Sequence, residues 1–247
     1  MSYMNENYDR TMQLELTKLP THVSLIMDGN GRWARQRGME RVYGHAEGVE
    51  SVRRVTEAAA RWGIGYVSFF AFSEENWDRP AEEVETLMEL MCKAMQNELP
   101  TFMENNIRFR VLGNLSRLSP ELRSIIDGTC AATAVNTGLT MILFLSYSGK
   151  WDILQAAGRL AHDLIGNPGL SIDADLFSSY LVTSGIPDPD LLIRTSGEKR
   201  ISNYLLWQTA YTEFVFTDTL WPDFREEAFR SALEEYAQRD RRFGKVK

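Results

Sequence analysis

Short, largely apolar segments alternate with amphipathic segments from residue 22 almost to the end of the chain. Apolar runs of this kind are typical of strands covered on both faces, and apolar residues at three- and four-residue spacing indicate helices. The predicted strands cover residues 22–28, 66–73, 107–113, 139–147, 191–195 and 214–217, and the predicted helices cover residues 48–62, 81–105, 120–134, 151–165, 174–181 and 225–239. This order predicts one α/β domain with a mostly parallel central β-sheet flanked by helices.

The length and composition fit a domain that folds without disulfides. The chain has 247 residues, 44% hydrophobic and 25% charged, which excludes a disordered or low-complexity protein. Cys92 and Cys130 form no C-x-x-C pair, and the apolar runs are too short to cross a bilayer. Residues 1–10 lack the apolar core of a signal peptide. We therefore expect a cytoplasmic protein with an N-terminal extension over residues 1–21 and one domain over residues 22–247.

The charge pattern narrows the class of partner. The formal net charge is −7, whereas nucleic-acid-binding proteins are usually basic, so we expect no nucleic-acid partner. Basic side chains nevertheless gather in three clusters, which are Arg32, Arg35, Arg37 and Arg41, then Arg194, Lys199 and Arg200, then Arg239, Arg241, Arg242 and Lys245. In an acidic protein, such clusters favour an anionic small molecule as the ligand.

The predicted helix over residues 81–105 is unusually rich in methionine. Its apolar positions follow helical spacing and include Val84, Leu87, Met88, Met91, Met95, Leu99 and Phe102. This pattern is typical of ordinary core packing. It also fits an adaptable wall beside an apolar cavity, because methionine side chains are flexible. The periodicity leaves both interpretations open.

A glycine motif follows the first predicted strand. Gly29, Asn30 and Gly31 allow left-handed backbone turns that direct N–H groups toward an anion. Residues 29–34 also fit the G-x-G-x-x-A dinucleotide fingerprint. We discount a dinucleotide site for two reasons. We expect the next helix to begin only near His45, outside the motif. The fingerprint also expects an acidic residue at the end of the second strand about twenty positions on, whereas the second predicted strand ends far later, at Ser73.

Asp28 directly precedes this turn. A carboxylate repels a bare phosphate unless a divalent cation bridges the two groups, and Mg²⁺ is the usual bridge. The alternative is an aspartate that merely caps the turn. The arginines that follow favour the interpretation as a metal–diphosphate site.

Two further polar segments follow predicted strands and should open on the same sheet edge. Residues 73–80 read SEENWDRP, and residues 194–202 read RTSGEKRIS. One arginine side chain can donate two parallel hydrogen bonds to phosphate oxygens. Two separate basic segments therefore indicate two phosphorylated substrates. His45 is expected at a helix start, where it either caps the helix or contacts a phosphate.

Five motifs in a fixed order resemble the cis-prenyltransferase (isoprenyl transferase) family. They are HVSLIMDGNGRWA over residues 22–34, FSEENWDRP over 72–80, DLLIRTSGEKRISN over 190–203, LWQTAYTEF over 206–214 and WPDF over 221–224. The resemblance extends roughly from residue 22 to residue 244. The chain has no D-D-x-x-D motif, so it does not resemble the trans-prenyltransferases.

The resemblance implies Mg²⁺-dependent condensation of isopentenyl diphosphate with an allylic diphosphate, farnesyl diphosphate being the expected primer. The product would be a long-chain polyprenyl diphosphate such as undecaprenyl diphosphate, for synthesis of the cell-wall lipid carrier. Asp28 and Asn76 are the implied catalytic residues, and Asp28 and Glu213 are the implied metal ligands. The implied substrate-binding residues are Gly29, Asn30, Gly31, Arg32, Trp33, Arg41, His45, Ser73, Glu74, Glu75, Trp77, Arg79, Arg194, Arg200, Ile201 and Ser202.

The resemblance also implies how the subunit and the product are arranged. Arg242, Phe243 and Gly244 look like the family's terminal R-x-G motif, which implies a homodimer whose tails reach the partner's site. The product would grow into an apolar tunnel along the methionine-rich helix, with Leu139, Met141 and Leu143 as candidates for its closed end. Peripheral membrane contact during product release is a further expectation. The alternatives are a non-catalytic partner subunit of a prenyltransferase complex and a nucleotide-binding enzyme.

Overall fold

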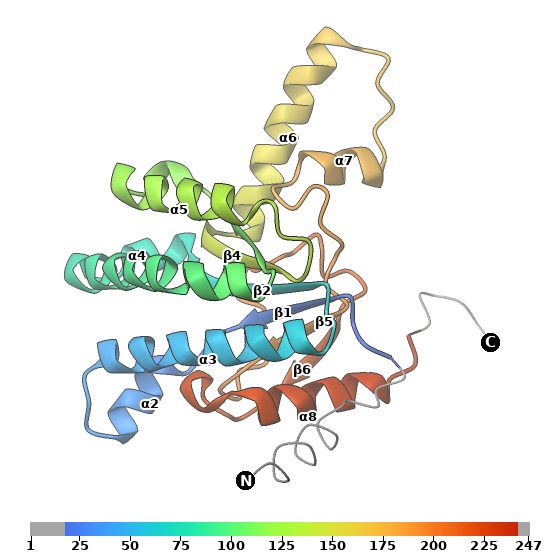
Figure 1. Ribbon diagram of the computed structural model, residues 1–247. Coiled ribbons are helices and arrows are strands. Elements are labelled where there is room, and N and C mark those ends of the chain that lie inside the picture. The colour runs from blue at the N-terminus through green and yellow to red at the C-terminus, as the bar shows by residue number, and fades with distance from the viewer. Residues whose placement is uncertain (1–17, 242–247) are drawn as a thin grey trace.

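The computed structural model describes residues 18–241, in which six strands form one sheet with helices on both faces (Figure 1). The strands are β1 (His22–Ile26), β2 (Tyr66–Ser73), β3 (Arg108–Leu112), β4 (Thr140–Tyr147), β5 (Leu191–Arg194) and β6 (Glu213–Phe216). They lie in the order β3-β4-β2-β1-β5-β6, and the pairings between them are all parallel. The α/β class and the six strands predicted from the apolar runs are therefore confirmed.

The helices return the chain from one end of the sheet to the other. They are α2 (Asn30–Gln36), α3 (Arg41–Arg61), α4 (Ala81–Glu104), α5 (Pro120–Thr133), α6 (Gly149–Gly166), α7 (Ala174–Tyr180) and α8 (Glu226–Ala237), with 3₁₀ turns η1 (Glu74–Asp78), η2 (Leu115–Arg117) and η3 (Trp221–Asp223). Side-chain caps begin three of them: the hydroxyls of Ser119 and Ser148 and the carboxylate of Asp173 accept backbone N–H groups of α5, α6 and α7. Figure 1 shows α6 and α7 extending away from the sheet.

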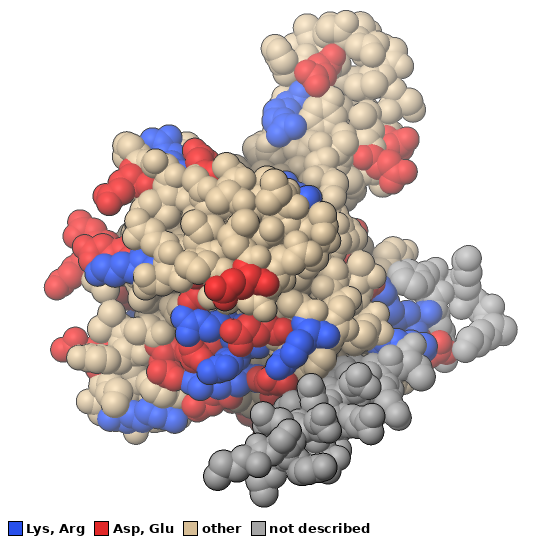
Figure 2. Space-filling view, in the orientation of Figure 1, with Lys and Arg blue, Asp and Glu red and all other residues tan. Residues whose placement is uncertain are grey.

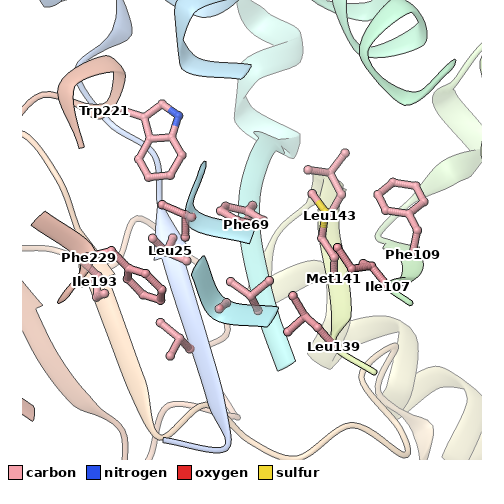
Figure 3. Close-up of a cluster of buried hydrophobic side chains, with 14 of the residues drawn as sticks. Leu25, Phe69, Ile107, Phe109, Leu139, Met141, Leu143, Ile193, Trp221 and Phe229 are labelled. Atoms are coloured by element: carbon pink, nitrogen blue, oxygen red, sulfur yellow. The ribbon is translucent and has the colours of Figure 1, made fainter. Parts of the chain in front are cut away.

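Alternation along β4 divides the core into two layers. Met141 and Leu143 pack in the larger cluster with residues of α3, α4, α5 and α8, whereas Ile142 and Phe144 belong to the cluster on the opposite face. Figure 3 shows Met141 and Leu143 close to Phe109 in the larger cluster. All eight residues of β4 are buried, which explains why its sequence reads as an uninterrupted apolar run.

Two helix starts differ from the prediction. Helix α2 begins at Asn30, inside the glycine motif, and α3 begins at Arg41, upstream of the start expected near His45. The pattern of α2 is hard to see because Ala34 is its one buried residue. Gly29 caps α2 in the left-handed region at φ 109°, a conformation that other residues rarely adopt.

Candidate active site

The carboxyl ends of β1 and β5 lie side by side near the middle of the sheet. Ile26 of β1 pairs in register with Arg194 of β5, and β1 has β2 on its other side. The next strand along the chain, β2, thus lies on one side of β1, and the later strand β5 lies on the other side. Ligands of open parallel sheets bind beyond the strand ends at such a switch point. The two basic segments that the sequence predicted at one edge do meet there.

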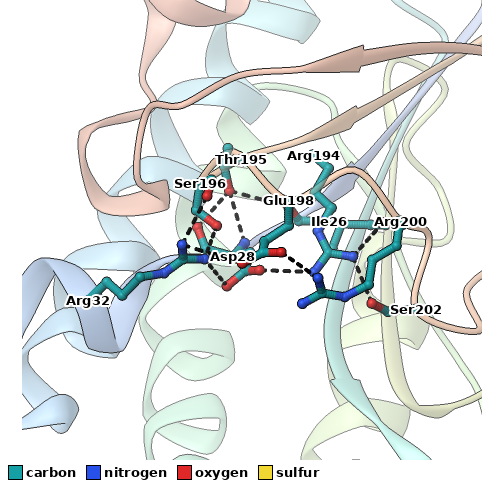
Figure 4. Close-up of polar contacts among 9 residues, drawn as sticks. All are labelled: Ile26, Asp28, Arg32, Arg194, Thr195, Ser196, Glu198, Arg200 and Ser202. Carbon is teal, nitrogen blue, oxygen red and sulfur yellow. Dashed lines mark hydrogen bonds and ion pairs between the residues drawn. The ribbon is translucent and has the colours of Figure 1, made fainter.

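Asp28 lies between two arginines at this edge (Figure 4). A guanidinium nitrogen of Arg194 lies 2.9 Å from one carboxylate oxygen, and one of Arg32 lies 3.3 Å from the other. Burial by itself would raise the pKa of Asp28, but the hydrogen bond and charge of Arg194, together with Arg32, outweigh burial and lower the pKa below its ordinary value. Asp28 is therefore charged at neutral pH.

The backbone of Asp28 is held from two sides. The Thr195 hydroxyl accepts the Asp28 N–H at 2.9 Å and donates to the Asp28 carbonyl at 2.7 Å. The N–H of Trp221 donates to the same carbonyl at 3.0 Å. Trp221 is fully buried and donates its indole N–H to the Gly48 carbonyl at 2.9 Å. The WPDF motif thus fixes the position of Asp28.

A chain of polar contacts joins the two basic segments. Arg32 donates to the Ser196 carbonyl at 3.0 Å and also contacts the Ser196 hydroxyl. Glu198 lies 3.6 Å from Arg32 and forms an ion pair with Arg200. Glu198 thus links Arg32, which follows the glycine motif, to Arg200 in the segment after β5.

Arg194 is almost completely buried, with 4% of its side chain exposed. Besides Asp28, it donates to the Ser202 hydroxyl at 2.7 Å and to the Arg200 carbonyl. A buried guanidinium with three such partners is fixed in direction. Arg194, Arg200 and Ser202 are thus adjacent, as the prediction of a shared substrate site requires.

Glycines allow α2 and α3 to cross closely behind this site. A Cβ atom on Gly44 would lie 2.0 Å from the Asn30 carbonyl oxygen, and a Cβ on Gly48 would lie 2.7 Å from the Asn30 side-chain oxygen. The Asn30 side-chain oxygen and Nε2 of His45 are buried and have no hydrogen-bond partner within residues 18–241. Both residues line the cavity described below, so their unpaired atoms are suited to a polar ligand.

His45 is neutral at physiological pH. Burial, with a smaller contribution from the charges of Arg79 and Arg41, lowers its pKa to about 4. It lies in the second turn of α3 rather than at the helix start. A neutral imidazole can donate one hydrogen bond to a phosphate oxygen.

Arg41 and Arg79 approach each other through Glu83. The Glu83 carboxylate lies 3.4 Å from Arg41 and 3.2 Å from Arg79. Burial, followed by the charge of Arg41, lowers the pKa of Arg79. The first turn of α4, the turn η1 and the start of α3 thus meet at the cavity mouth. Glu83 was not among the predicted site residues.

The loop after β2 closes on itself as a capping box. The Ser73 hydroxyl accepts the Asn76 N–H, and the Ser73 N–H donates to the Asn76 side-chain oxygen at 3.1 Å. Both residues line the cavity. Because the Asn76 oxygen already accepts a backbone hydrogen bond, its NH₂ group is the more available polar group for a ligand.

Three predicted residues anchor this loop or bridge it to its neighbours. Trp77 donates its indole N–H to the Ser146 hydroxyl at 2.9 Å, and that hydroxyl lies 2.8 Å from the Glu74 carboxylate. Glu75 accepts from the Asn203 amide at 2.7 Å and also lines the cavity. Trp77 and Glu74 therefore position the loop against β4, while Glu75 connects it to the segment after β5.

Trp33 and Ile201 also have packing or anchoring partners. Trp33 donates its indole N–H to Asp223 at 2.8 Å and lies beneath the Arg37 guanidinium at 4.0 Å from the ring centre. Ile201 packs against the core cluster on the face of α6. These contacts position α2 against η3 and the segment after β5 against the sheet.

One cavity of about 700 Å³ begins beside Asp28 and Arg194 and continues between α3, α4 and the sheet. Its apolar part is lined by Val52, Leu87, Met91, Met95, Phe109, Met141 and Leu143, among others. The interpretation of the methionine-rich helix as a cavity wall is therefore confirmed. Of the three strand residues expected at the closed end, Met141 and Leu143 line the cavity, whereas Leu139 is buried beside it in the core.

Glu213 does not lie with Asp28 in one chain. It begins β6 and pairs in register with Leu191, the first residue of β5, whereas Asp28 lies just beyond the carboxyl end of β1, after Ile26 and Met27. Its carboxylate is 3.0 Å from Arg239. Glu213 is thus at the amino ends of the parallel strands, opposite to the carboxyl ends where Asp28 lies. The predicted motif at Arg242, Phe243 and Gly244 lies outside the described residues.

Comparison with known families agrees with this geometry. A prenyltransferase family model described as "Putative undecaprenyl diphosphate synthase" matches residues 26–244, which include both basic segments and the cavity. The chain belongs to this prenyltransferase family. The resemblance predicted from the five motifs is therefore confirmed.

Members of this prenyltransferase family are similar to the chain over almost all of their length. An isoprenyl transferase of Porphyromonas gingivalis is 51% identical over 92% of this chain and 91% of its own. A ditrans,polycis-undecaprenyl-diphosphate synthase of Aliivibrio fischeri, named as specific for (2E,6E)-farnesyl diphosphate, is 48% identical over 94% of this chain and 91% of its own. The lavandulyl diphosphate synthase of Lavandula x intermedia, solved with dimethylallyl diphosphate, has a TM-score of 0.89 and 35% identity, with 92% and 98% of the two chains covered.

The prenyltransferase site fits Mg²⁺ held by one carboxylate and a diphosphate. Within residues 18–241, no group of three or more His, Cys, Asp or Glu side chains could hold a metal ion. Mg²⁺ is commonly bound by one or two carboxylates with substrate phosphates and water, and Asp28 is a charged, 30% exposed carboxylate at the cavity mouth. The donor set therefore fits the ion when a diphosphate is present.

The position of α2 removes one of the two reasons for discounting a dinucleotide site. A helix does begin within the glycine motif, contrary to expectation. The second strand, β2, does end at Ser73, far later in the chain than the dinucleotide fingerprint requires. The prenyltransferase matches favour a diphosphate ester over a dinucleotide. No helix in the described part of the chain has the length and apolar character of a membrane span.

Proposed function

We propose that this chain is a Mg²⁺-dependent cis-prenyltransferase that extends an allylic diphosphate, farnesyl diphosphate in the first instance, with isopentenyl diphosphate. The observation that carries the proposal is the position of Asp28, between the two arginine-bearing segments and at the mouth of an apolar cavity. Two anion-binding segments match two diphosphates, and the cavity matches a growing hydrocarbon. The names of the relatives support this reaction class and a product such as undecaprenyl diphosphate. We further propose that this product serves as a cell-wall lipid carrier.

The allylic diphosphate is assigned to the segment after β1. Gly29, Asn30, Gly31 and Arg32 offer the first N–H groups of α2 and one guanidinium, and His45 and Arg41 add donors from α3. Asp28 would hold Mg²⁺, which neutralises the charge that accumulates on the diphosphate as the allylic C–O bond breaks. The role of the protein is to bind and orient this leaving group.

Isopentenyl diphosphate is assigned to Arg194, the last residue of β5, and to Arg200 and Ser202 in the segment that follows. A new carbon–carbon bond forms at the allylic carbon, pyrophosphate leaves, and one proton is lost from the isopentenyl group. Asn76 faces the cavity and orients the reacting diphosphate through its NH₂ group, because its oxygen is already bound to Ser73. An amide is a weak base, so the proton passes to a more basic acceptor such as a diphosphate oxygen.

A homodimer completes the proposal. Within one chain, Glu213 lies at the amino ends of the strands and Asp28 beyond their carboxyl ends. Glu213 can therefore bind the metal of this site only across a subunit interface. The predicted terminal R-x-G motif would likewise reach the partner's site. We further propose residues 22–247 as the catalytic domain after an extension over residues 1–21, a cytoplasmic location, and peripheral membrane contact when the hydrocarbon product is released.

The direct test mixes the purified protein with farnesyl diphosphate, isopentenyl diphosphate and Mg²⁺. We expect pyrophosphate release that needs both substrates, and a ladder of longer prenyl alcohols after dephosphorylation. A non-catalytic partner subunit would bind the diphosphates without releasing pyrophosphate, and that result would contradict the proposal. Titration with NAD or ATP tests the nucleotide alternative, for which we expect no saturable binding.

A further inference from the structure

An ion pair joins α3 to α4 across the wall of the apolar cavity. The Nε atom of Arg53 lies 3.0 Å and 3.1 Å from the two carboxylate oxygens of Glu98, and a second guanidinium nitrogen also contacts this carboxylate. Glu98 is 8% exposed, and both residues line the cavity. The pair lies beside the apolar lining residues Leu90, Ala94 and Met95, and Glu57 of α3 is a further charged residue of the lining.

The pair extends from the cavity lining, where Glu98 is buried, to the surface, where Arg53 is partly exposed. Figure 2 shows acidic and basic side chains interleaved over α3, beside a broad surface with few charges. Arg53 is 38% exposed and is also held by Glu50 of its own helix at 2.7 Å. Arg54, the next residue, pairs instead with Glu50 and Glu57 on α3 and is 53% exposed. Arg53 therefore bridges the two helices, whereas Arg54 stays on one.

The pair lies far from the diphosphate site. Both helices begin at the cavity mouth, where Arg41 and Glu83 are 3.4 Å apart. At about 1.5 Å per residue, Arg53 lies about 18 Å beyond Arg41 along α3, and Glu98 lies about 22 Å beyond Glu83 along α4. The end of a growing chain would therefore reach this pair only after several condensations.

The cavity is too small for a long product. A cavity of about 150 Å³ holds benzene, or about 25 Å³ per carbon, so a volume of about 700 Å³ holds roughly 28 carbons, or five to six isoprene units. The relative from Aliivibrio fischeri is named for an undecaprenyl product, which has eleven such units. If this chain makes products of that length, part of the hydrocarbon must leave the cavity or displace its wall.

The seam between α3 and α4 is the place where charge opposes such a displacement. Hydrocarbon that passes here must either cover the two charged groups or separate them, and both are unfavourable. Elsewhere the lining is mainly apolar and adapts by side-chain rearrangement, as the methionines of α4 allow. The pair thus presents a barrier at a defined depth.

We propose that Arg53 and Glu98 help to determine product length, because their ion pair closes the seam between α3 and α4 and a prenyl chain that outgrows the cavity must disrupt it. This inference rests on the proposed prenyltransferase function. It differs from a purely steric limit set by residues on β4, because it depends on charge as well as on volume. It assigns a role to a pair that lies outside the diphosphate site.

The test replaces both charges by apolar side chains of similar size, Arg53→Met with Glu98→Leu. Well-packed apolar replacements of a buried ion pair commonly preserve the fold. We expect the dephosphorylated products to shift toward longer chains, with a several-fold rise in the ratio of longer products to the principal wild-type product. Glu98→Gln, which keeps the shape but removes the charge, should shift the products in the same direction by less.

Two controls separate this role from general effects. The exchanged pair, Arg53→Glu with Glu98→Arg, is made together with Glu50→Gln, so that Glu50 does not repel the carboxylate introduced at position 53. It should restore the wild-type lengths if the ion pair is what matters. Arg54→Met with Glu89→Leu alters exposed charges of the same helices and should leave the distribution unchanged. An unchanged distribution in both the apolar double variant and Glu98→Gln, with folding verified by circular dichroism, would overturn the inference. A wild-type protein that makes no product would instead refute the proposed function.

Discussion

The guanidinium of Arg194 lies 2.9 Å from the carboxylate of Asp28, where β5 and β1 end side by side. The same guanidinium also donates to Ser202. One buried arginine therefore joins the residue assigned to the metal and the residues assigned to isopentenyl diphosphate. A change at Arg194 should affect both substrates, so Arg200 gives the cleaner test of the second substrate site.

Arg200→Gln should raise the KM for isopentenyl diphosphate at least about tenfold, since it removes a charged donor to a phosphate. The KM for the allylic diphosphate should change much less. Arg32→Gln should instead raise the KM for the allylic diphosphate more than the KM for isopentenyl diphosphate. Steady-state kinetics with each substrate varied in turn measures both effects, and Arg123→Gln, at an exposed position of α5, is the matched control. Equal changes in both KM values for Arg200→Gln would show that the two sites are assigned incorrectly.

Met141→Trp should shorten the products, because a larger side chain fills part of the cavity that the growing chain needs. Met141→Ala should lengthen them, since it enlarges the same space. Chromatography of the dephosphorylated products gives the distribution, and Met141→Leu, which nearly conserves volume, should leave it close to wild type. The steric account of β4 is refuted if the distribution is the same in all three variants.

Sequence patterns predicted the shared edge of Asp28 and Arg194 because both follow apolar runs, and parallel strands end at one edge. They missed α2 because Ala34 alone is buried in it, so it has no apolar stripe to detect. The predicted strand over residues 214–217 already places Glu213 at its amino end, away from Asp28, and the role of Glu213 as a metal ligand was implied by the family resemblance alone. The pair of Arg53 and Glu98 was invisible because each residue reads as an ordinary charge on a helix surface.

Folding stability should decline in mild acid partly because of His45. Its pKa is about 4 in the folded protein against 6.5 ordinarily, so the unfolded chain takes up a proton between these values that the folded protein does not. This group's contribution to stability is complete above pH 6.5 and is lost as the pH falls toward 4, by up to about 1.4 kcal/mol per pH unit.

The His45→Gln variant should therefore show a smaller loss of unfolding free energy between pH 7 and pH 5 than the wild-type protein. Urea unfolding at pH 7 and at pH 5 measures this loss of unfolding free energy. The matched control is His162→Gln, at an exposed position of α6. If His45→Gln and wild type lose the same free energy over this interval, the buried, neutral state assigned to His45 is wrong.

The central claim is that Asp28 is the carboxylate through which the metal and the departing diphosphate act. Asp28→Ala removes this carboxylate from the cavity mouth, and its effect should fall on kcat, because the assistance is needed only as the allylic bond breaks. The most direct measurement is Mg²⁺-dependent pyrophosphate release from farnesyl and isopentenyl diphosphates by the folded Asp28→Ala variant, beside wild type and Asp127→Ala, an exposed carboxylate of α5. We predict that Asp28→Ala loses nearly all turnover while Asp127→Ala retains wild-type activity. An Asp28→Ala variant that keeps half of the wild-type kcat would contradict the account.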